Sequence, residues 1–286
     1  MKLAVLGTAA RDVGAVAAHH PGVSEVVAID VNDDVSGGDW LGVVVSADTD
    51  GAARLARAAL TAGHRVLLVG TPAGEHAVWS EVAESAPDRM SLSRPSRFDP
   101  HIARASEVVR AGTVGAPRTL EICWSFGDGA DATAVATELV DVACLLLDGG
   151  PASVYAVACE VAGPPLVKVN LLAANGAIAA IEATGESDDF PIRRDLHLLA
   201  TNGEIVHRIG QDDLLWREGR AEPLPGASGI DELRAQEIAA WLEGGDGGER
   251  LARGAAVGWN LRATKALSRS LAGGEMVSIG EEVGRS

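Results

Sequence analysis

The sequence predicts an α/β protein with two domains. The first is built on a parallel sheet, and the second is an α+β domain with a large, mostly antiparallel sheet. Up to about residue 116, short apolar runs alternate with helical segments, which is typical of a parallel sheet covered on both faces. Beyond that point apolar and polar residues alternate along several runs, and turn signals such as Asn175-Gly176 separate them. The predicted domains are 1–118 and 119–286.

Length, composition and charge restrict the class of function. The chain has 286 residues, of which 47% are hydrophobic and 22% charged, so it is long enough and apolar enough for a globular protein with an ample core. A net charge of −16 argues against binding to nucleic acid or to an anionic membrane surface. No apolar run reaches the roughly 18 residues of a membrane span, and the N-terminus lacks the layout of a signal peptide.

The three cysteines point to a reducing compartment. Cys123, Cys144 and Cys159 lie in apolar runs and form no CxxC pair. We therefore expect all three to be buried and reduced, in a cytoplasmic protein.

The chain opens on a strand, a glycine turn, a helix and a second strand. The apolar run 3–6 ends at Gly7, an Ala/Val-rich segment follows, and the run 25–29 ends on Asp30. This order is the opening unit of a Rossmann-type dinucleotide-binding domain, in which the acidic residue closes the second strand.

The remaining elements follow from the same patterns. In the first domain we predict strands at 41–45, 65–69 and 90–93 and helices at 50–62 and 75–85. In the second domain we predict strands at 118–125, 153–161, 166–173, 177–183, 195–200, 204–208 and 214–217, and helices at 132–147, 229–242 and 249–271.

Three segments resemble one family, the Gfo/Idh/MocA oxidoreductases, which include relatives of glucose–fructose oxidoreductase and inositol dehydrogenase. Residues 96–118, SRFDPHIARASEVVRAGTVGAPR, are similar to the "RFxP", long helix and "GxIGxP" connection between the family's two domains. Residues 52–72, AARLARAALTAGHRVLLVGTP, resemble the helix, "AGK" turn and strand that normally end in Glu-Lys-Pro. The tail, from NGAIAAIEA through DELRAQEIAAWLEGG to LSRSLAGGEMVSI, is similar to the last strands and closing helices. The resemblance covers essentially the whole chain and implies use of NAD or NADP to oxidise or reduce a sugar, a cyclitol or a similar polyol.

The resemblance places the phosphate-binding loop at Gly7. Of the family's Gly-x-Gly-x-x-Gly, the second glycine is Ala9 here and the third is Asp12. The Ala9 methyl is a moderate obstacle to a pyrophosphate, and a carboxylate near the helix N-terminus would compete with phosphate for the same N–H groups. The alternative is that Asp12 caps its own helix. Arg11 could offset this charge or bind a phosphate directly.

Two further positions concern the cofactor. Asp30 matches the position that holds the adenosine ribose, where an acid favours NAD over NADP; the alternative is that it caps the next turn. The motif Thr-Pro-x-x-x-His that covers the nicotinamide is replaced by Ala47-Asp48, with Ala52 in place of the histidine. Pro72 survives from Glu-Lys-Pro. We therefore expect the chain to bind NAD or NADP, with NAD favoured, in a pocket whose lining differs from that of the family.

The family's catalytic side chains are all replaced. Thr71 stands at the lysine of Glu-Lys-Pro, Ala134 at the aspartate of the later Asp-x-x-x-His pair, and Glu138 at its histidine. Asp141 matches an aspartate three residues further on. Alcohol oxidation needs a group that takes the hydroxyl proton, commonly worth about 10²- to 10⁴-fold in rate, and Thr71 cannot do this at neutral pH.

Glu138 is the candidate base that remains. Glu138 and Asp141 are three residues apart on one face of a mostly apolar helix, and two carboxylates so close and partly buried can raise the pKa of one of them toward neutrality. The alternative is that both are ionic partners of Arg97 or Arg118.

Four further residues are candidates for a substrate pocket, although a lone histidine or tryptophan is more often structural: Arg97, His101, Trp124 and Lys168. No Cys/His cluster or HxxxH spacing indicates a metal, and no GxSxG indicates a serine nucleophile.

Three functions stay open. The first is an NAD(P)-dependent oxidoreductase of a sugar-like or polyol small molecule with a rebuilt proton relay. The second is a non-catalytic homologue (a pseudoenzyme) that serves as a sensor, scaffold or partner subunit. The third is a lyase or isomerase that uses the old pocket without a free nicotinamide. The resemblance also implies a homodimer or homotetramer through the open face of the second-domain sheet.

Overall fold

The structure is a computed structural model that describes residues 2–72, 76–127, 131–159, 165–185, 193–208, 214–217, 220–223, 230–243 and 248–280. It divides into two compact units. The first comprises Met1–Phe98 with Ser228–Leu261, and the second comprises Asp99–Ala227 with Arg262–Ser286. This division differs from the predicted boundary at residue 118. The chain leaves the first unit after Phe98, and a later segment, Ser228–Leu261, belongs to the first unit again.

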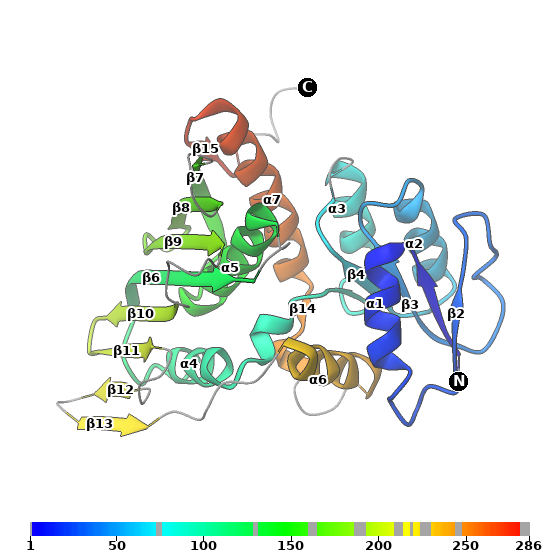
Figure 1. Ribbon diagram of the computed structural model, residues 1–286, viewed down its shortest axis with the longest axis horizontal. Coiled ribbons are helices and arrows are strands. Elements are labelled where there is room, and N and C mark those ends of the chain that lie inside the picture. Colours follow the sequence, from blue (N-terminus) through cyan, green and yellow to red (C-terminus); the bar gives the residue numbers. More distant parts are fainter. Residues whose placement is uncertain are drawn as a thin grey trace. The chain divides into compact units, whose positions relative to one another are not determined.

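The first unit is built on a six-stranded sheet with the order β14-β5-β4-β3-β1-β2 (Figure 1). Its strands are β1 (Lys2–Leu6), β2 (Glu25–Ala28), β3 (Trp40–Ser46), β4 (Val66–Val69), β5 (Met90–Leu92) and β14 (Ala252–Arg253). The first five are parallel, and β14 pairs antiparallel with β5. The chain steps from β1 to β2 on one side and from β3 to β4 on the other, so the strand order reverses between β1 and β3.

Helices cover both faces of this sheet, as buried parallel strands require. The helices are α1 (Thr8–Ala17), α2 (Ala52–Thr61), α3 (His76–Ser85), α6 (Ile230–Glu243) and the first part of α7 (Ala255–Gly273). Leu3 and Val5 of β1 pack with residues of α1 and α6, whereas Ala4 and Leu6 pack with residues of α2, α3 and α7. The strict alternation along β1 therefore assigns each helix to one side.

Helix α6 belongs to the first unit because its C-terminal end is fixed to the sheet. The ring of Trp241 lies against Gly42 of β3, where an added Cβ would come within 2.8 Å of the ring atom Cζ2. Arg65 Nη1 donates to the carbonyls of Trp241 and Leu242 at 2.7 and 3.0 Å. An arginine in this position satisfies carbonyls that a helix end leaves unpaired.

A buried carboxylate fixes the middle of α6. Glu237 is 1% exposed and accepts from Ser93 Oγ at 2.7 Å and from the backbone N–H of Arg94. Both partners directly follow β5, just before the 3₁₀ helix η1 (Pro95–Phe98). The contact ties α6 to the end of the parallel sheet.

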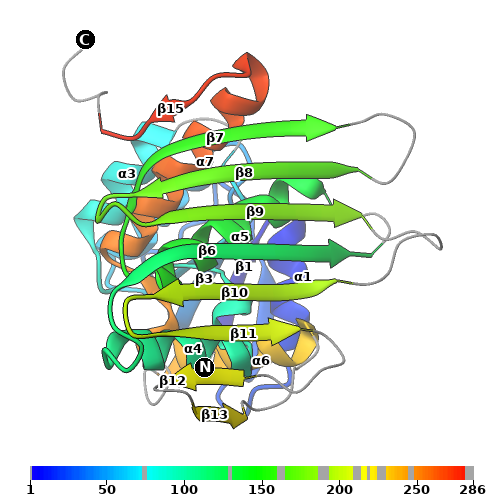
Figure 2. The same cartoon turned by 90° about the vertical axis from the view of Figure 1, so that its left-hand side faces the viewer.

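The second unit is built on a nine-stranded sheet with the order β13-β12-β11-β10-β6-β9-β8-β7-β15 (Figure 2). Its strands are β6 (Pro117–Phe126), β7 (Pro151–Cys159), β8 (Leu166–Ala173), β9 (Ile178–Gly185), β10 (Arg194–Ala200), β11 (Gly203–Arg208), β12 (Leu214–Arg217), β13 (Arg220–Pro223) and β15 (Val277–Ser278). Every pair is antiparallel except β6 with β9. The mostly antiparallel second sheet, and with it the predicted fold class, is confirmed.

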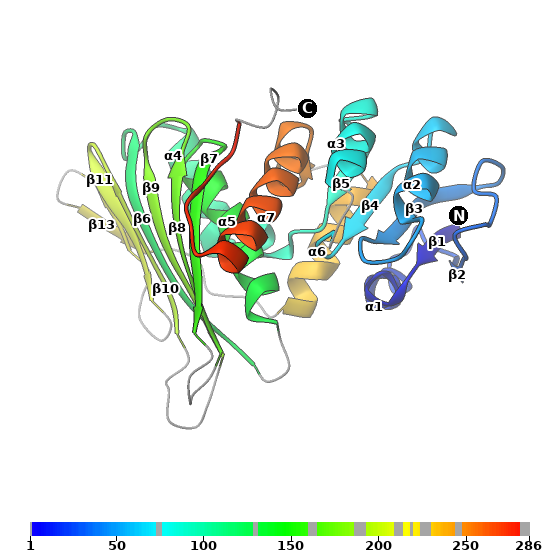
Figure 3. The same cartoon turned by 90° about the horizontal axis from the view of Figure 1, so that it is seen from above.

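One face of the nine-stranded sheet is covered. Helices α4 (Pro100–Arg110), α5 (Ala132–Leu146) and the end of α7 share one apolar core with the inward residues of the strands. Among the elements that the structure describes, no helix covers the opposite face, here called the outer face (Figure 3).

The predicted helix 249–271 begins later than expected. Its place is taken by the 3₁₀ helix η2 (Gly248–Arg250), by β14 and then by α7 from Ala255. Gly254, with φ of 54°, separates β14 from α7. A left-handed residue cannot continue a helix, so the regular helix starts beyond it.

The cysteine prediction is only partly right. All three cysteines are free, and Cys144 is buried as expected, but Cys123 is half-buried and Cys159 is exposed. Cys159 ends β7 and points away from the covered face, because Val154 and Ala156 alternate with it toward the core. Within the described ranges, no helix has both the length and the apolar character needed to cross a membrane.

Candidate functional site

The carboxyl edge of the first-unit sheet gathers most of the predicted cofactor residues. Gly7 directly follows β1, Ala47 follows β3, and Thr71 and Pro72 follow β4 after one glycine. Asp30 lies two residues beyond β2. In open α/β sheets, ligands bind outside the carboxyl ends of the strands where the strand order reverses, which here is between β1 and β3.

Gly7 forms the tight turn between β1 and α1. Its φ is 86°, and an added Cβ would overlap the side chains of Ser46 and Thr49 at the end of β3. Gly7 is also the N-cap of α1, and no side chain caps that helix end. Ala9, half-buried, and Arg11, exposed, lie in the first turn. The free first-turn N–H groups and the positive end of the helix dipole are therefore available to an anion.

The expectation that Asp12 caps its own helix is wrong. Helix α1 begins at Thr8, so Asp12 lies beyond the first turn, where it is exposed. A side chain there is too far along the helix to take the first N–H groups. Close packing of helix on strand is provided instead by the buried Gly14, where an added Cβ would lie 3.0 and 3.1 Å from methyl carbons of Val5 and Val26.

Replacing Gly7 with alanine is expected to lower the free energy of unfolding by about 2 to 5 kcal/mol. A left-handed conformation costs an L-residue roughly 1 to 2 kcal/mol, and crowding a packed site costs about 1 to 3 kcal/mol. Urea unfolding followed by tryptophan fluorescence measures the change. Gly37→Ala is the matched control, because an added Cβ at Gly37 meets nothing within 4 Å. A Gly7→Ala protein as stable as the Gly37→Ala protein would contradict the packing described.

Asp30 caps the turn after β2. Its Oδ1 accepts from the backbone N–H and from the side-chain amide of Asn32, both at 3.1 Å. Its own N–H donates to Asp33 Oδ2 at 2.7 Å. The capping interpretation is therefore confirmed, and because Asp30 is exposed, the carboxylate also stays accessible to a ligand.

The predicted nicotinamide end of the edge has small side chains at Ala47, Thr71 and Pro72, with the exposed carboxylate of Asp48 next to Ala47. Ala47 is buried, and its N–H donates to the carbonyl of Val69 at 2.8 Å. Thr71 is half-buried and Pro72 is buried. Thr71 keeps a hydroxyl at this edge but brings no positive charge.

Two of the predicted catalytic residues lie one turn apart on α5 of the second unit. Glu138 is half-buried, whereas Asp141 is 1% exposed and Ala134 is exposed. A side chain that reaches solvent can also reach a substrate, so Glu138 is the better candidate for proton transfer. Asp141 lies among the apolar residues by which α5 packs on the sheet.

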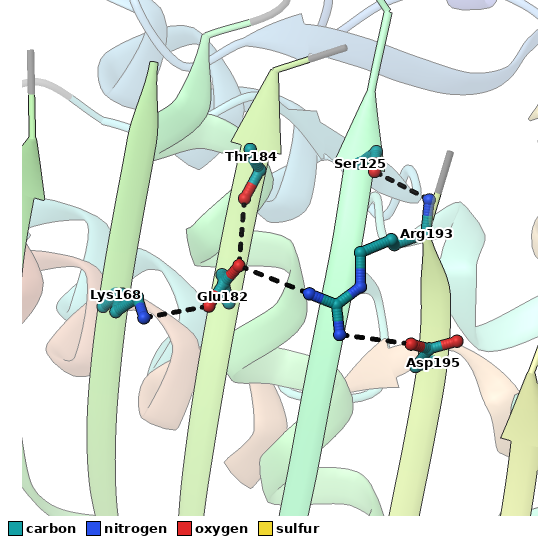
Figure 4. Close-up of polar contacts among 6 residues, drawn as sticks. All are labelled: Ser125, Lys168, Glu182, Thr184, Arg193 and Asp195. Carbon is teal, nitrogen blue, oxygen red and sulfur yellow. Dashed lines mark hydrogen bonds and ion pairs between the residues drawn. The ribbon is translucent and has the colours of Figure 1, made fainter. Parts of the chain in front are cut away.

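The four predicted pocket residues are not brought together by the structure. Trp124 packs against the core on the covered side of the nine-stranded sheet, with Arg194 over its ring. Lys168 lies on the outer face and pairs with Glu182 at 3.0 Å (Figure 4). A pocket shared by Trp124 and Lys168 is therefore excluded, because strand residues of opposite parity point to opposite faces.

The other two pocket candidates are buried. His101 is 3% exposed; its ring bonds Asp99 at 3.2 Å and stacks on His207 at 4.0 Å. Arg97, 5% exposed, donates to the carbonyls of Arg250 and Leu251 in the first unit, at 3.5 Å. Within the described ranges no cluster of His, Cys, Asp and Glu could hold a metal ion.

Comparison with known proteins rests on structure alone, since no family model and no curated protein sequence matches the chain. An oxidoreductase from Agrobacterium radiobacter in complex with NAD+, L-tartaric acid and magnesium superposes with a TM-score of 0.77 at 16% identity, over 98% of this chain and 99% of that one. The chain therefore shares the fold of this oxidoreductase. An NAD binding oxidoreductase from Klebsiella pneumoniae gives 0.75 at 15% identity, over 98% of both chains. Levoglucosan dehydrogenase, in complex with NADH and levoglucosan, gives 0.71 at 18% identity, over 98% of this chain and 99% of that one.

Sequence reasoning missed several residues at the carboxyl edge. Gly14 replaces the packing glycine two positions after the expected one, and a search for any glycine in the second turn would have found it. Thr49 packs on Gly7, and Arg54 reaches the turn after β2 from α2. No local pattern signals these two contacts, because each joins segments that are distant in the sequence.

Proposed function

We propose that this chain binds a nicotinamide dinucleotide, with NAD favoured, at the carboxyl edge of the first-unit sheet. We further propose that it acts as an oxidoreductase on a sugar-like or polyol small molecule. The observation that carries the proposal is the uncapped N-terminus of α1 behind Gly7, at the point where the strand order reverses. Such a helix end binds phosphate through backbone N–H groups.

The residues at this edge fit a dinucleotide. The turn at Gly7 has the required left-handed conformation, Gly14 allows the close packing of helix on strand, and Asp12 leaves the N–H groups free. Exposed Asp30 supports NAD rather than NADP, because a carboxylate accepts a hydrogen bond from the ribose hydroxyl and repels a 2′-phosphate. A bound nicotinamide would supply hydride transfer. The chain would then have to bind the polyol and remove its hydroxyl proton.

Dinucleotide binding is tested by the melting temperature. A ligand that binds only the native state at 100 times its dissociation constant adds about 2.7 kcal/mol to the free energy of unfolding, roughly 5 to 10 °C for a domain of this size. We expect NADH at millimolar concentration to give a shift in this range and NADPH to give a smaller one. No shift with either dinucleotide would rule out the proposed site.

The proton relay is proposed to run through Glu138, with Asp141 as its neighbour. A second candidate function, a non-catalytic homologue, is favoured by Thr71 and Ala134, which have no group that takes a proton at neutral pH. A chain that binds NADH but oxidises or reduces no polyol would support that second function. Turnover of a substrate without added dinucleotide would support a lyase or isomerase instead.

We also propose that two copies associate through the outer face of the nine-stranded sheet. Most of the large hydrophobic side chains that are exposed lie on this face: Tyr155, Val157, Leu172, Ile178 and Leu199. The register aligns Leu172 with Ile178 across β8 and β9, and Ile178 with Thr119 across β9 and β6. A band of apolar side chains on an otherwise acidic protein is typical of a contact with another protein surface.

Charge on the outer face supports a second copy as the partner. The face carries the carboxylates Glu121, Glu182, Asp195 and Glu204 and the basic residues Lys168, Arg193, His197 and Arg208. Figure 4 shows part of this set, in which Arg193 lies between Glu182 at 3.8 Å and Asp195 at 3.3 Å. Because the chain has a net charge of −16, two copies repel each other least where they meet through a surface that carries charges of both signs.

Leu172→Arg is expected to weaken self-association about 30-fold or more, because a charge placed in a buried hot spot costs roughly 2 kcal/mol or more. Light scattering after size-exclusion chromatography, over a dilution series, measures the effect. Ile230→Arg is the control, since Ile230 is exposed and lies on α6 in the first unit, outside the nine-stranded sheet. An unchanged mass for the Leu172→Arg protein would place the interface elsewhere.

The three free cysteines support the proposal of a reducing, cytoplasmic setting.

A further inference from the structure

The C-terminal half of α7 is basic, although the chain as a whole is acidic. The chain has 40 acidic residues against 24 lysines and arginines, yet no aspartate or glutamate occurs between Glu249 and Glu275. Arg262, Lys265 and Arg269 lie in this interval three and four residues apart, so they share one face of the helix. Arg262 and Arg269 are exposed, and Lys265 is half-buried. The positive charges are therefore gathered along one line of α7.

A hollow lies beside this face of α7, here called the basic hollow. Its lining consists of the three basic side chains, of Ala266 from the same helix, and of residues 277–280, which include β15. Strand β15 and the end of α7 lie side by side (Figure 1). All of the lining residues belong to the second unit. The basic hollow therefore shares no residue with the carboxyl edge of the first-unit sheet.

The side chains that line the basic hollow offer hydrogen-bond donors. The guanidinium and ammonium groups only donate, and the exposed Ser278 hydroxyl can donate as well. The N–H of Ile279 donates to the carbonyl of Ala152 in β7 at 2.7 Å, so the N–H of the preceding Ser278 points away from β7, toward the free edge of β15. Among the described residues, none that lines the hollow is acidic. The lining is therefore suited to an anion.

The size and the walls of the basic hollow restrict that anion. Its volume is about 80 Å³, whereas a water molecule needs roughly 10 to 15 Å³ and drug-sized ligands occupy pockets of roughly 300 to 1,000 Å³. Ala266, Val277 and Ile279 also belong to the apolar packing of the second unit, so the walls are partly hydrocarbon. A short anion with a carbon skeleton fits both properties.

We propose that the basic hollow binds a short organic anion of charge −2, a dicarboxylate or a phosphate monoester. Arg262 and Arg269 are seven residues apart, roughly 10 Å along the helix axis, with Lys265 between them. A guanidinium presents paired N–H donors that match carboxylate and phosphate oxygens. Binding would also relieve the repulsion among three like charges on neighbouring turns. The site lies outside the proposed oxidoreductase function.

Titration calorimetry with succinate and with glycerol 3-phosphate, at low ionic strength and without a dinucleotide, tests the proposal. We expect at least one of the two anions to bind, and added sodium chloride to weaken the binding. Arg262→Gln and Arg269→Gln are each expected to weaken it about 10-fold, because each removes a charge-assisted hydrogen bond. Arg104→Gln is the matched control and is expected to bind as the unaltered chain does. It removes the same charge from the second unit, at an exposed position on α4 where Arg104 pairs with Glu107 at 3.3 Å.

Each outcome supports or overturns the basic hollow as a ligand site. Binding of succinate alone identifies a dicarboxylate, and binding of glycerol 3-phosphate alone identifies a phosphate monoester; both support the proposal. Equal affinities for the three arginine variants would overturn it, because net charge alone would then explain the binding. Inorganic phosphate that binds as tightly as the organic anions would overturn the role of the apolar walls, and no binding of either anion would overturn the site.

One further variant distinguishes an external anion from an internal one. The sequence continues after Gly280 with Glu281 and Glu282, so the titration is repeated with Glu281→Gln/Glu282→Gln. An anion that binds this variant and not the unaltered chain would identify the chain's own acidic residues as the occupant, and the proposal of an external ligand would be overturned. Because no dinucleotide is present, none of these results depends on the proposed function.

Discussion

Trp241→Ala is expected to lower the free energy of unfolding by about 3 to 5 kcal/mol, the largest loss of stability that we predict for one substitution. The Trp241 ring is 1% exposed and fills the space above Gly42, between α6 and the parallel sheet. Removing it leaves a cavity that rigid strands cannot close. Folded proteins of this size are stable by only about 5 to 15 kcal/mol, so the variant would lose a large share of its stability.

A second substitution at the same position separates packing from polarity. The indole N–H of Trp241 is buried and has no hydrogen-bond partner among the described residues. Phenylalanine keeps most of the ring and removes this unpaired group, so Trp241→Phe is expected to cost less than about 1.5 kcal/mol.

Chemical denaturation with urea measures both variants, and Trp40→Ala serves as the control because Trp40 is only half-buried. A loss at Trp241 no larger than at Trp40 would contradict the assignment of α6 to the first unit.

The same helix shows where prediction from sequence ends. A helix at 229–242 is predictable from its pattern and is confirmed, but its place in the first unit is not. Leu233, Glu237 and Trp241 are all buried and recur every four residues, so a glutamate stands on the apolar stripe. A glutamate in such a stripe indicates that its carboxylate has a buried polar partner. The partners, Ser93 and the N–H of Arg94, lie more than a hundred positions away and carry no local sign of the contact.

The candidate site divides in a similar way. The turn at Gly7 and the acid at Asp30 are predictable, because strand, glycine and acidic residue occur in a fixed order. The role of Asp12 is not predictable in the same way. It depends on where helix α1 begins, and α1 begins at Thr8, directly after the turn that ends β1. Replacement of the family's catalytic residues by Thr71, Ala134 and Glu138 is visible in sequence, but exposure alone distinguishes Glu138 from its buried neighbour Asp141.

Glu138→Gln is expected to lower turnover of a polyol substrate with NAD by about 10²- to 10⁴-fold, while NADH binding stays unchanged. The amide keeps the size and the hydrogen-bonding reach of the side chain but cannot accept the hydroxyl proton. A loss confined to turnover would therefore identify Glu138 as the base and not as a packing residue. Initial rates with saturating NAD, together with the NADH-induced melting shift, measure the two effects separately.

Two further variants make this result specific. Glu84→Gln removes one carboxylate on the exposed side of α3 and is expected to leave turnover unchanged. Asp141→Asn alters a buried carboxylate one turn from Glu138. We expect it to lower the free energy of unfolding and to lower turnover less than Glu138→Gln does. Undiminished turnover of the Glu138→Gln protein would exclude Glu138 as the base. The second-unit helix α5 would then offer only the buried Asp141, and the non-catalytic function would gain the stronger support.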